Sequence, residues 1–150
     1  MTKVIAVIIL ILALLWIAHS SDAARPPSEV LPPGPARIDI QSSLERTEKQ
    51  GDVLVVNGTL WNKRITSRPI GSSIAYCPAP FDEIVSLCHV IFRFPKGYIV
   101  GIGIVSSGVY YRLSIVGGTG YYRNVGGQVV STTLRAKPRW DRLIFSLKAF

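Results

Sequence analysis

The sequence predicts an all-β domain of antiparallel strands, either a two-layer sandwich or a closed barrel. From Ile38 onward, no segment repeats its apolar residues with the 3.6-residue period of a helix. Short runs rich in β-branched and aromatic residues recur instead. Glycine, proline and serine separate these runs, as at residues 95–97 and 106–108, and such clusters mark turns.

Eight strands are expected in order along residues 36–149. They are residues 36–43, 52–61, 69–77, 87–94, 98–106, 109–116, 127–135 and 142–149. Val53–Val56 marks the second strand, Val90–Phe92 the fourth and Tyr110–Tyr111 the sixth, because such residues favour a pleated surface. Val53–Val56 and Tyr98–Val105 are apolar on both faces, which indicates that another subunit covers the outside of the domain.

Residues 1–23 are expected to be a secretory signal peptide. Lys3 precedes an unbroken apolar run over residues 4–18, and the small residues Ser21 and Ala23 precede the expected cleavage position. A membrane anchor is the alternative, but a run of this length at about 1.5 Å per residue does not cross a ~30 Å bilayer core. Cleavage would release a secreted protein, extracellular, apoplastic or periplasmic, without a stable membrane anchor.

Residues 24–36 hold five prolines, and this composition predicts an extended linker before a barrel domain at 37–150. Secretion would place Cys77 and Cys88 in an oxidising compartment. A disulfide between them would clip a short loop and stabilise the domain by about 2–3 kcal/mol. The alternative is a pair of separate thiols, one of which lines a pocket.

The chain is basic, with 17 Lys and Arg against 9 Asp and Glu and a net charge of +8. The basic residues are scattered and form no known nucleic-acid-binding module, so no nucleic-acid partner is expected. A secreted basic barrel would instead meet anionic wall polymers, glycans or membrane surfaces. With two histidines and two cysteines, the sequence predicts no metal site, and it implies no organic cofactor.

Residues 116–129 read as a glycine-rich turn between two strands. Glycine tolerates positive φ angles, and an adjacent tyrosine can pack the turn against the domain. The residues expected to build this turn are Gly117, Gly118, Gly120, Tyr122 and Gly127. A phosphate cradle needs a following helix, whereas a strand follows Gly127 here.

The same segment resembles the GGTG-x-[YF]-x-x-x-x-G signature of the allene oxide cyclase and dirigent protein superfamily. Weaker similarities occur in order on both sides of it, so the resemblance covers about residues 36–150. They lie at residues 51–61, 70–77, 88–97 and 137–147. The resemblance implies an eight-stranded antiparallel barrel with a ligand-binding lumen, commonly trimeric. Its members fold a reactive fatty-acid epoxide, couple phenoxy radicals on one face, or cyclise natural products.

The resemblance to the cyclases implies catalytic candidates. Asp39 and Gln41 occupy the positions of a Glu and an Asn on the first strand, each differing by one methylene. Cys77 matches a cyclase cysteine, although a bond to Cys88 would occupy it, and Asn57 lies beside the position of a strand Asn. A buried carboxylate could stabilise positive charge on a substrate. The alternative for Asp39 is a solvated edge residue.

Dirigent-like pockets use Asp, Arg, Tyr and Thr around a phenolic ligand, and Tyr111, Arg112 and Thr132 are available here. Tyr111 and Arg112 are adjacent on a strand, so only one of them can line the lumen. His89 is expected to be a packed or mouth-facing strand residue.

These observations predict a secreted barrel that encloses a small hydrophobic or phenolic molecule and steers its stereoselective cyclisation or radical coupling. Enzymatic activity, if present, would be that of an isomerase or cyclase without a cofactor. The alternative is a non-catalytic secreted binding or surface-interaction protein on the same scaffold. An open cavity lined by Asp39, Gln41 and tyrosines would favour the first hypothesis, and a lumen plugged by Ile and Phe side chains would contradict it.

Overall fold

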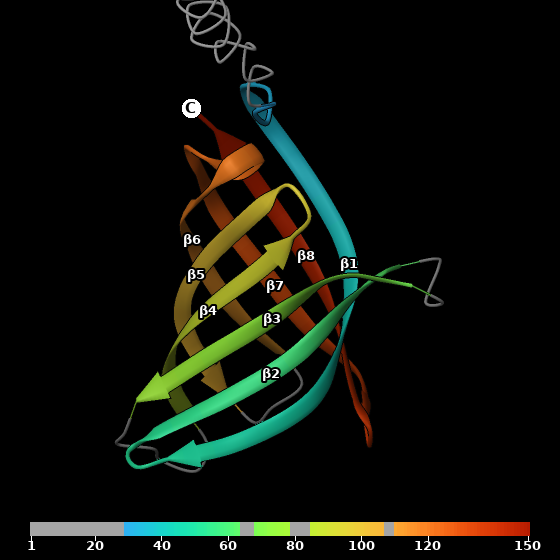
Figure 1. Ribbon diagram of the computed structural model, residues 1–150, viewed down its shortest axis with the longest axis vertical. Coiled ribbons are helices and arrows are strands. Elements are labelled where there is room, and N and C mark those ends of the chain that lie inside the picture. The colour runs from blue at the N-terminus through green and yellow to red at the C-terminus, as the bar shows by residue number, and fades with distance from the viewer. Residues whose placement is uncertain (1–28, 64–67, 79–84, 107–109) are drawn as a thin grey trace, which may run out of the picture.

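The computed structural model describes residues 29–63, 68–78, 85–106 and 110–150, which form a closed barrel of eight antiparallel strands (Figure 1). The strands are β1 (Gly34–Gln50), β2 (Val53–Asn62), β3 (Pro69–Pro78), β4 (Val85–Phe94), β5 (Gly97–Ser106), β6 (Tyr110–Gly118), β7 (Val125–Ala136) and β8 (Arg139–Ala149). Each strand pairs with the next along the chain, and β8 pairs with β1. The all-β prediction is confirmed, and the barrel is the correct form of it.

The strand bounds differ most at β1, which was expected to end at residue 43 and continues to Gln50. Residues 44–50 are mostly polar and have little local preference for a strand. Their pairing with β2 therefore holds them in the sheet. β1 also begins at Gly34, inside the expected linker, because its first residues pair with the end of β8. The expected signal peptide and the linker up to residue 28 lie outside the described residues.

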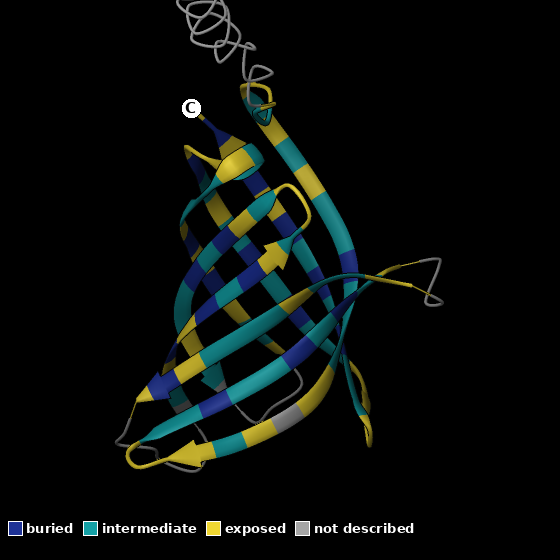
Figure 2. Cartoon of the chain, in the orientation of Figure 1, coloured by how far each residue is buried: buried dark blue, intermediate teal, exposed yellow. Residues whose placement is uncertain are grey.

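Alternate side chains point into the lumen and away from it, as the bands of burial in Figure 2 show. β8 has the clearest pattern, in which every second residue from Asp141 to Ala149 is buried. A bulge in β1 between Leu44 and Arg46 shifts the register against β2. The face of each side chain is therefore fixed by the pairing across the whole barrel.

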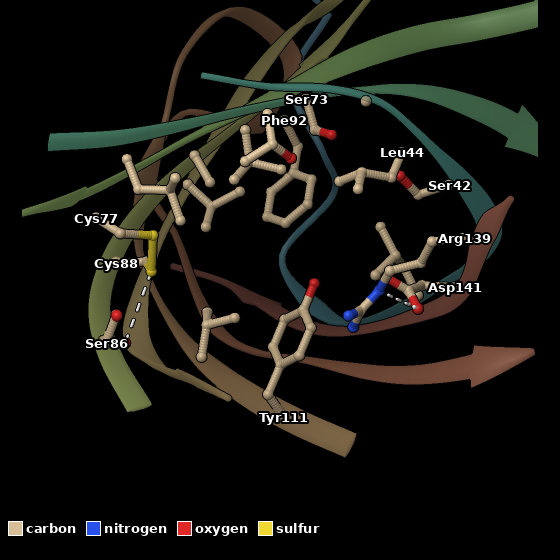
Figure 3. Close-up of a pocket in the computed structure, with 18 residues that line it drawn as sticks. Ser42, Leu44, Ser73, Cys77, Ser86, Cys88, Phe92, Tyr111, Arg139 and Asp141 are labelled. Atoms are coloured by element: carbon tan, nitrogen blue, oxygen red, sulfur yellow. Dashed lines mark hydrogen bonds and ion pairs between the residues drawn. A yellow bond between two sulfur atoms is a disulfide. The ribbon is translucent and has the colours of Figure 1, made fainter. Parts of the chain in front are cut away.

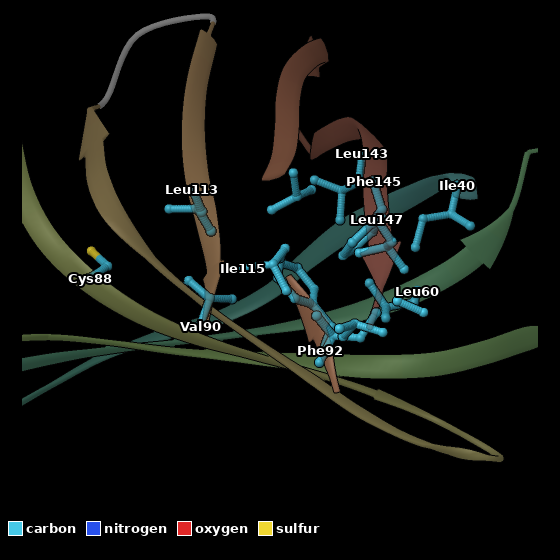
Figure 4. Packing of buried hydrophobic residues seen from close by; sticks show 14 of the residues in the cluster. Ile40, Leu60, Cys88, Val90, Phe92, Leu113, Ile115, Leu143, Phe145 and Leu147 are labelled. Atoms are coloured by element: carbon cyan, nitrogen blue, oxygen red, sulfur yellow. The ribbon is translucent and has the colours of Figure 1, made fainter. Parts of the chain in front are cut away.

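One half of the lumen is filled by apolar side chains and forms the closed end of the barrel (Figure 4). Phe145 is fully buried and meets Phe92 edge to face, with 4.9 Å between ring centroids. Phe94 adds a second edge-to-face contact to Phe145 at 6.1 Å. Such aromatic contacts add to the stabilisation that burial of the rings provides.

The glycine-rich turn caps this closed end. After β6, a single 3-10 turn, η2 (Gly120–Tyr122), places the Tyr122 ring 5.4 Å from that of Phe94. Gly120 has a φ of +58°, and a Cβ there would overlap the carbonyl oxygen of Lys96. The turn therefore needs glycine both for its backbone angle and for its close approach to the β4–β5 turn.

The segment before β1 lies against the same end. The Leu31 amide donates to the Tyr121 carbonyl at 2.7 Å, and Lys96 pairs with Glu29 while its ammonium lies 5.1 Å from the centre of the Tyr121 ring. The Phe150 amide donates to the Asn124 carbonyl at 3.0 Å. Both ends of the described chain therefore meet at the closed end. Within the described ranges, no helix has the length and apolar character that a membrane crossing requires.

Candidate functional site

The other half of the lumen is an open cavity of about 260 Å³ (Figure 3). It is surrounded by the C-terminal halves of the odd-numbered strands and the N-terminal halves of the even-numbered ones, away from the closed end. Its apolar wall includes Leu54, Val56, Val90, Phe92 and Leu143. The lumen is therefore plugged at one end and open at the other, which leaves room for a small molecule.

A polar cluster lies on one side of this cavity. The Arg139 Nε atom donates to both carboxylate oxygens of Asp141, at 3.2 and 3.1 Å, and the Thr133 hydroxyl donates to Oδ1 of Asp141 at 2.8 Å. Asp141 is buried, so these partners stabilise its charge. Among the described residues, only Nε of Arg139 is bonded to protein, which leaves its terminal Nη groups available to a ligand.

Tyr111 stands next to this cluster on β6. Figure 3 shows its hydroxyl and the Arg139 guanidinium pointing into the same space. Burial raises the pKa of the Tyr111 phenol, and the hydroxyl of Ser131 partly opposes that shift. Tyr111 is therefore neutral at physiological pH and can donate a hydrogen bond to an oxygen of a bound molecule.

Small side chains form the part of the cavity wall that crosses β1, β2 and β3, next to Phe92, which pairs with Ser73. Ser42, Gly58 and Ser73 are neighbours across β1, β2 and β3, and all three line the cavity. A Cβ on Gly58 would lie 2.8 Å from the Ser73 hydroxyl oxygen and 3.1 Å from that of Ser42. The space in this half of the lumen therefore depends on the absence of large side chains along this wall.

The cysteines lie in the wall of the same cavity. Cys77 of β3 and Cys88 of β4 are both buried, line the cavity and are joined by a disulfide, so the expected clip is present. Cys77 therefore has no free thiol and cannot act as the cysteine of the cyclases does in the resemblance.

Asp39 and Gln41, the expected catalytic pair, lie on the outer surface of β1. Their neighbours Ile38 and Ile40 face the core, and adjacent residues of a strand point to opposite faces. Asp39 accepts hydrogen bonds from Arg142 at 2.9 and 2.6 Å and from Lys63 at 2.9 Å. The structure therefore places the pair outside the lumen. Asp39 is an ion-paired residue of the outer face and not the solvated edge residue of the alternative, because the closed barrel has no edge strand.

These partners give Asp39 a pH-dependent role in stability. The hydrogen bonds from Arg142 hold the pKa of the Asp39 carboxyl well below its usual range, with a smaller contribution from Lys63. A lowered folded-state pKa stabilises the protein above the ordinary pKa of about 3.9, and the contribution is lost as the pH falls toward the folded value.

We therefore expect Asp39→Asn to lower the melting temperature by about 2–5 °C at pH 7, and the difference from the parent to shrink between about pH 5 and pH 2. Thermal unfolding followed by circular dichroism across this range measures both quantities. Asp52→Asn, in the exposed β1–β2 turn, is the matched control and should change the melting temperature little at any pH. A difference for Asp39→Asn that grows on acidification would contradict the assignment.

The other expected ligand-binding residues divide between the two faces. Tyr111 lines the cavity, whereas Arg112 is exposed and donates to the Tyr110 hydroxyl at 2.9 Å. The expected separation of Tyr111 and Arg112 is thus found. Thr132 points outward because Ser131 before it is buried in the lumen, and Asn57 points outward because Gly58 after it lines the cavity. His89 is exposed on the outside of β4.

Sequence reasoning missed Arg139 and Asp141, because the last strand was expected to begin at residue 142. The sequence does contain a pattern that predicts their position. Leu143, Phe145 and Leu147 alternate along the strand, and the same alternation continued toward the N-terminus places Asp141 and Arg139 on the face of these three residues. In the part of the chain that the structure describes, no group of three metal-ligating side chains could hold a metal ion.

No model of a protein family matches the sequence, and no curated protein matches it. Solved structures do match. A pyocyanin demethylase is similar with a TM-score of 0.62 and 14% identity, over 75% of this chain and 100% of that chain. The pterocarpan synthase dirigent protein PsPTS1 has a TM-score of 0.62 and 11% identity, over 77% of this chain and 96% of that one.

The Diels-Alderase AbmU from Streptomyces koyangensis is also similar, with a TM-score of 0.62 and 15% identity, over 77% of this chain and 64% of that one. At this level of sequence identity, the comparison shows a shared fold and not a shared activity. The chain has the eight-stranded barrel fold of dirigent proteins and of Diels-Alderase and cyclase barrels.

Proposed function

We propose that this protein binds a small, mostly apolar or phenolic molecule in its lumen and steers the stereoselective cyclisation or radical coupling of that molecule. The observation that carries the proposal is the half-open lumen, in which an apolar wall faces a neutral phenol and an oriented guanidinium. The similar structures named as a Diels-Alderase and as a dirigent protein support a barrel that acts in this way.

The mechanism would be control of conformation. A cavity of about 260 Å³ restricts a flexible molecule to few conformations, and holding reacting atoms in contact lowers the barrier without any covalent intermediate. Tyr111 and the Nη groups of Arg139 would hold a carbonyl or phenolic oxygen, while Asp141 and Thr133 keep the guanidinium in position. Donors fixed in advance stabilise negative charge that develops on that oxygen.

Secretion and assembly are part of the proposal. The expected signal peptide and the disulfide Cys77–Cys88 both favour an oxidising compartment. A homotrimer is supported by an outer apolar face over β3, β4 and β5. Its most exposed members are Tyr76, Leu87, Tyr98 and Ile104, which are between 40% and 60% exposed. A patch of this kind is typical of a surface that another subunit covers.

Filling the lumen should abolish binding. We expect the parent protein to bind trans-cinnamic acid, a flat apolar probe with an acceptor oxygen, and Ala75→Leu, which adds volume to the cavity wall, to remove the signal. Tyr111→Phe should weaken binding about five- to tenfold, because it deletes one hydrogen bond of about 1 kcal/mol. Isothermal titration calorimetry measures both effects.

Thr132→Val is the matched control, since it deletes a hydroxyl on the outer face of β7 and should leave the affinity unchanged. Equal affinity in Ala75→Leu and the parent would show that the lumen is not the binding site. The alternative function, binding without conversion, is distinguished by the product. Incubation with a metabolite extract, followed by native mass spectrometry and chiral chromatography, would then give a bound molecule but no enrichment of one stereoisomer.

A further inference from the structure

A second concave surface lies on the outside of the barrel. A groove of about 360 Å³ runs over β1 to β4, and most of the residues that line it are polar. They are Glu45, Asn57, Gly58, Thr59, Ser72, Ser73, Ile74 and Arg93. The hydroxyl of Thr59 donates to the Glu45 carboxylate, so one acceptor and one donor of the groove are already oriented.

Two tryptophans continue this groove along β1. Ser43 of β1 lies opposite Thr59 of β2 on one side and opposite Trp140 of β8 on the other. The Trp61 indole donates from Nε1 to the Ser43 hydroxyl at 2.8 Å, and the centroids of the Trp61 and Trp140 rings are 5.9 Å apart. Both rings are half-buried. A pair of indoles on the outer face of the sheet is thus contiguous with the polar groove.

A fixed ionic cluster borders the tryptophans on the far side. Gln41 lies opposite Trp61 on β2 and opposite Arg142 on β8, and Arg142 holds the carboxylate of Asp39 with two hydrogen bonds. Lys63 is bonded to the same carboxylate. Along β1, the surface therefore presents the polar residues of the groove, then the two tryptophan rings, and then the ionic cluster.

We propose that this outer surface, composed of the groove, the Trp61–Trp140 pair and the Asp39–Arg142–Lys63 cluster, is a binding site for a glycan chain. The faces of indole rings attract polarised C–H groups, and a sugar ring presents such C–H groups on one side. Carboxylate, amide, hydroxyl and guanidinium groups match the hydroxyls on its edge. The core of a protein interface is usually apolar. The many hydrogen-bonding groups of this surface, which carry both signs of charge, therefore suit an oligosaccharide better than a protein partner.

This site faces away from the lumen. Asn57, Thr59 and Trp61 alternate with lumen-facing residues of β2, so the tryptophan pair and the ionic cluster do not line the cavity. The groove shares only Gly58 and Ser73 with the cavity, in the wall between them. The tryptophan pair and the ionic cluster lie away from the outer apolar face over β3 to β5, and the groove meets that face at Arg93, which lies opposite Tyr98. This site adds a ligand class to the proposed function and does not require the lumen to act on a substrate.

The test is titration of the full chain with two hexasaccharides, a neutral β-1,4-linked N-acetylglucosamine hexamer and an acidic α-1,4-linked galacturonate hexamer. Isothermal titration calorimetry gives the affinity. The full chain also contains Trp16, so the part of the change in tryptophan emission that Trp140→Ala removes reports on the Trp61–Trp140 pair. We expect at least one hexamer to bind. Trp140→Ala should weaken binding at least tenfold, and Arg93→Ala, an exposed change in the groove, should weaken it about threefold or more.

Two controls separate this proposal from the others. Leu134→Ala changes an exposed side chain on β7 and should leave the affinity unchanged, and Ala75→Leu, which fills the lumen, should also leave it unchanged. Binding of only the neutral or only the acidic hexamer supports the proposal and identifies the class of glycan. Failure of both hexamers to bind the parent, or equal affinity in the parent, Trp140→Ala and Arg93→Ala, would overturn it.

Discussion

Replacing Phe145 by alanine is expected to lower the free energy of unfolding by about 3–5 kcal/mol, the range typical of a buried aromatic residue. Phe145 has no exposed surface and makes edge-to-face contacts with Phe92 and Phe94. Its removal would leave a cavity where the lumen is otherwise filled, and the closed antiparallel sheet around it cannot easily collapse into that space. The loss therefore combines transfer of apolar area to water with unfilled volume.

Urea unfolding followed by circular dichroism measures this change. Phe150→Ala is the matched control, because the same atoms are removed from a side chain that is 76% exposed, and the expected change is below about 1 kcal/mol. Comparable losses in the two variants would mean that the closed end is not the main hydrophobic core. The apolar plug, rather than the pocket, is thus expected to supply most of the stability of the domain.

Gly127→Ala is expected to destabilise the barrel by more than about 3 kcal/mol or to prevent folding. Gly127 lies near the start of β7 with a φ of +128°, a conformation that L residues rarely adopt. A Cβ there would also overlap the carbonyl oxygen of Ser146 on β8. Relief of both conflicts would require β7 and β8 to separate where they are paired.

Gly117→Ala is the matched control for this effect. A Cβ on Gly117 would meet no heavy atom within 4 Å, so the expected change in stability is within about 1 kcal/mol. Yield of folded protein and urea unfolding compare the two variants. Equal stability of Gly127→Ala and Gly117→Ala would contradict the argument that close packing of β7 on β8 requires glycine at position 127.

Local sequence was sufficient for the fold class and for most strands. Runs such as Val90–Phe92 carry a strong β preference. The glycines of the turn at residues 117–127 indicate the positive φ angles that this turn requires. The last seven residues of β1 were not predictable in this way. Residues 44–50 are mostly polar and form a strand because β2 pairs beside them. That pairing is a tertiary property, which overrides local preference.

The candidate site was less predictable than the fold, because the face of each strand residue depends on register. A shift of one residue exchanges all lumenal and outer positions of a strand. Tyr111 and Arg112 could be separated by alternation alone, but nothing local states which of them faces inward. The resemblance predicts a lumenal Asp39, whereas in the structure its neighbours Ile38 and Ile40 face the core. The lumenal acid, Asp141, lies instead on the last strand.

The arrangement of the two ends of the barrel has a practical consequence for attaching this protein to a surface. Leu31 and Phe150 both lie at the closed end, whereas the turn at Gly51-Asp52 belongs to the rim of the open end (Figure 1). A flexible tether joined after Phe150 would therefore present the mouth of the cavity to the surrounding liquid. An immobilised array made in this way would leave the cavity accessible from the liquid without any change to the lumen.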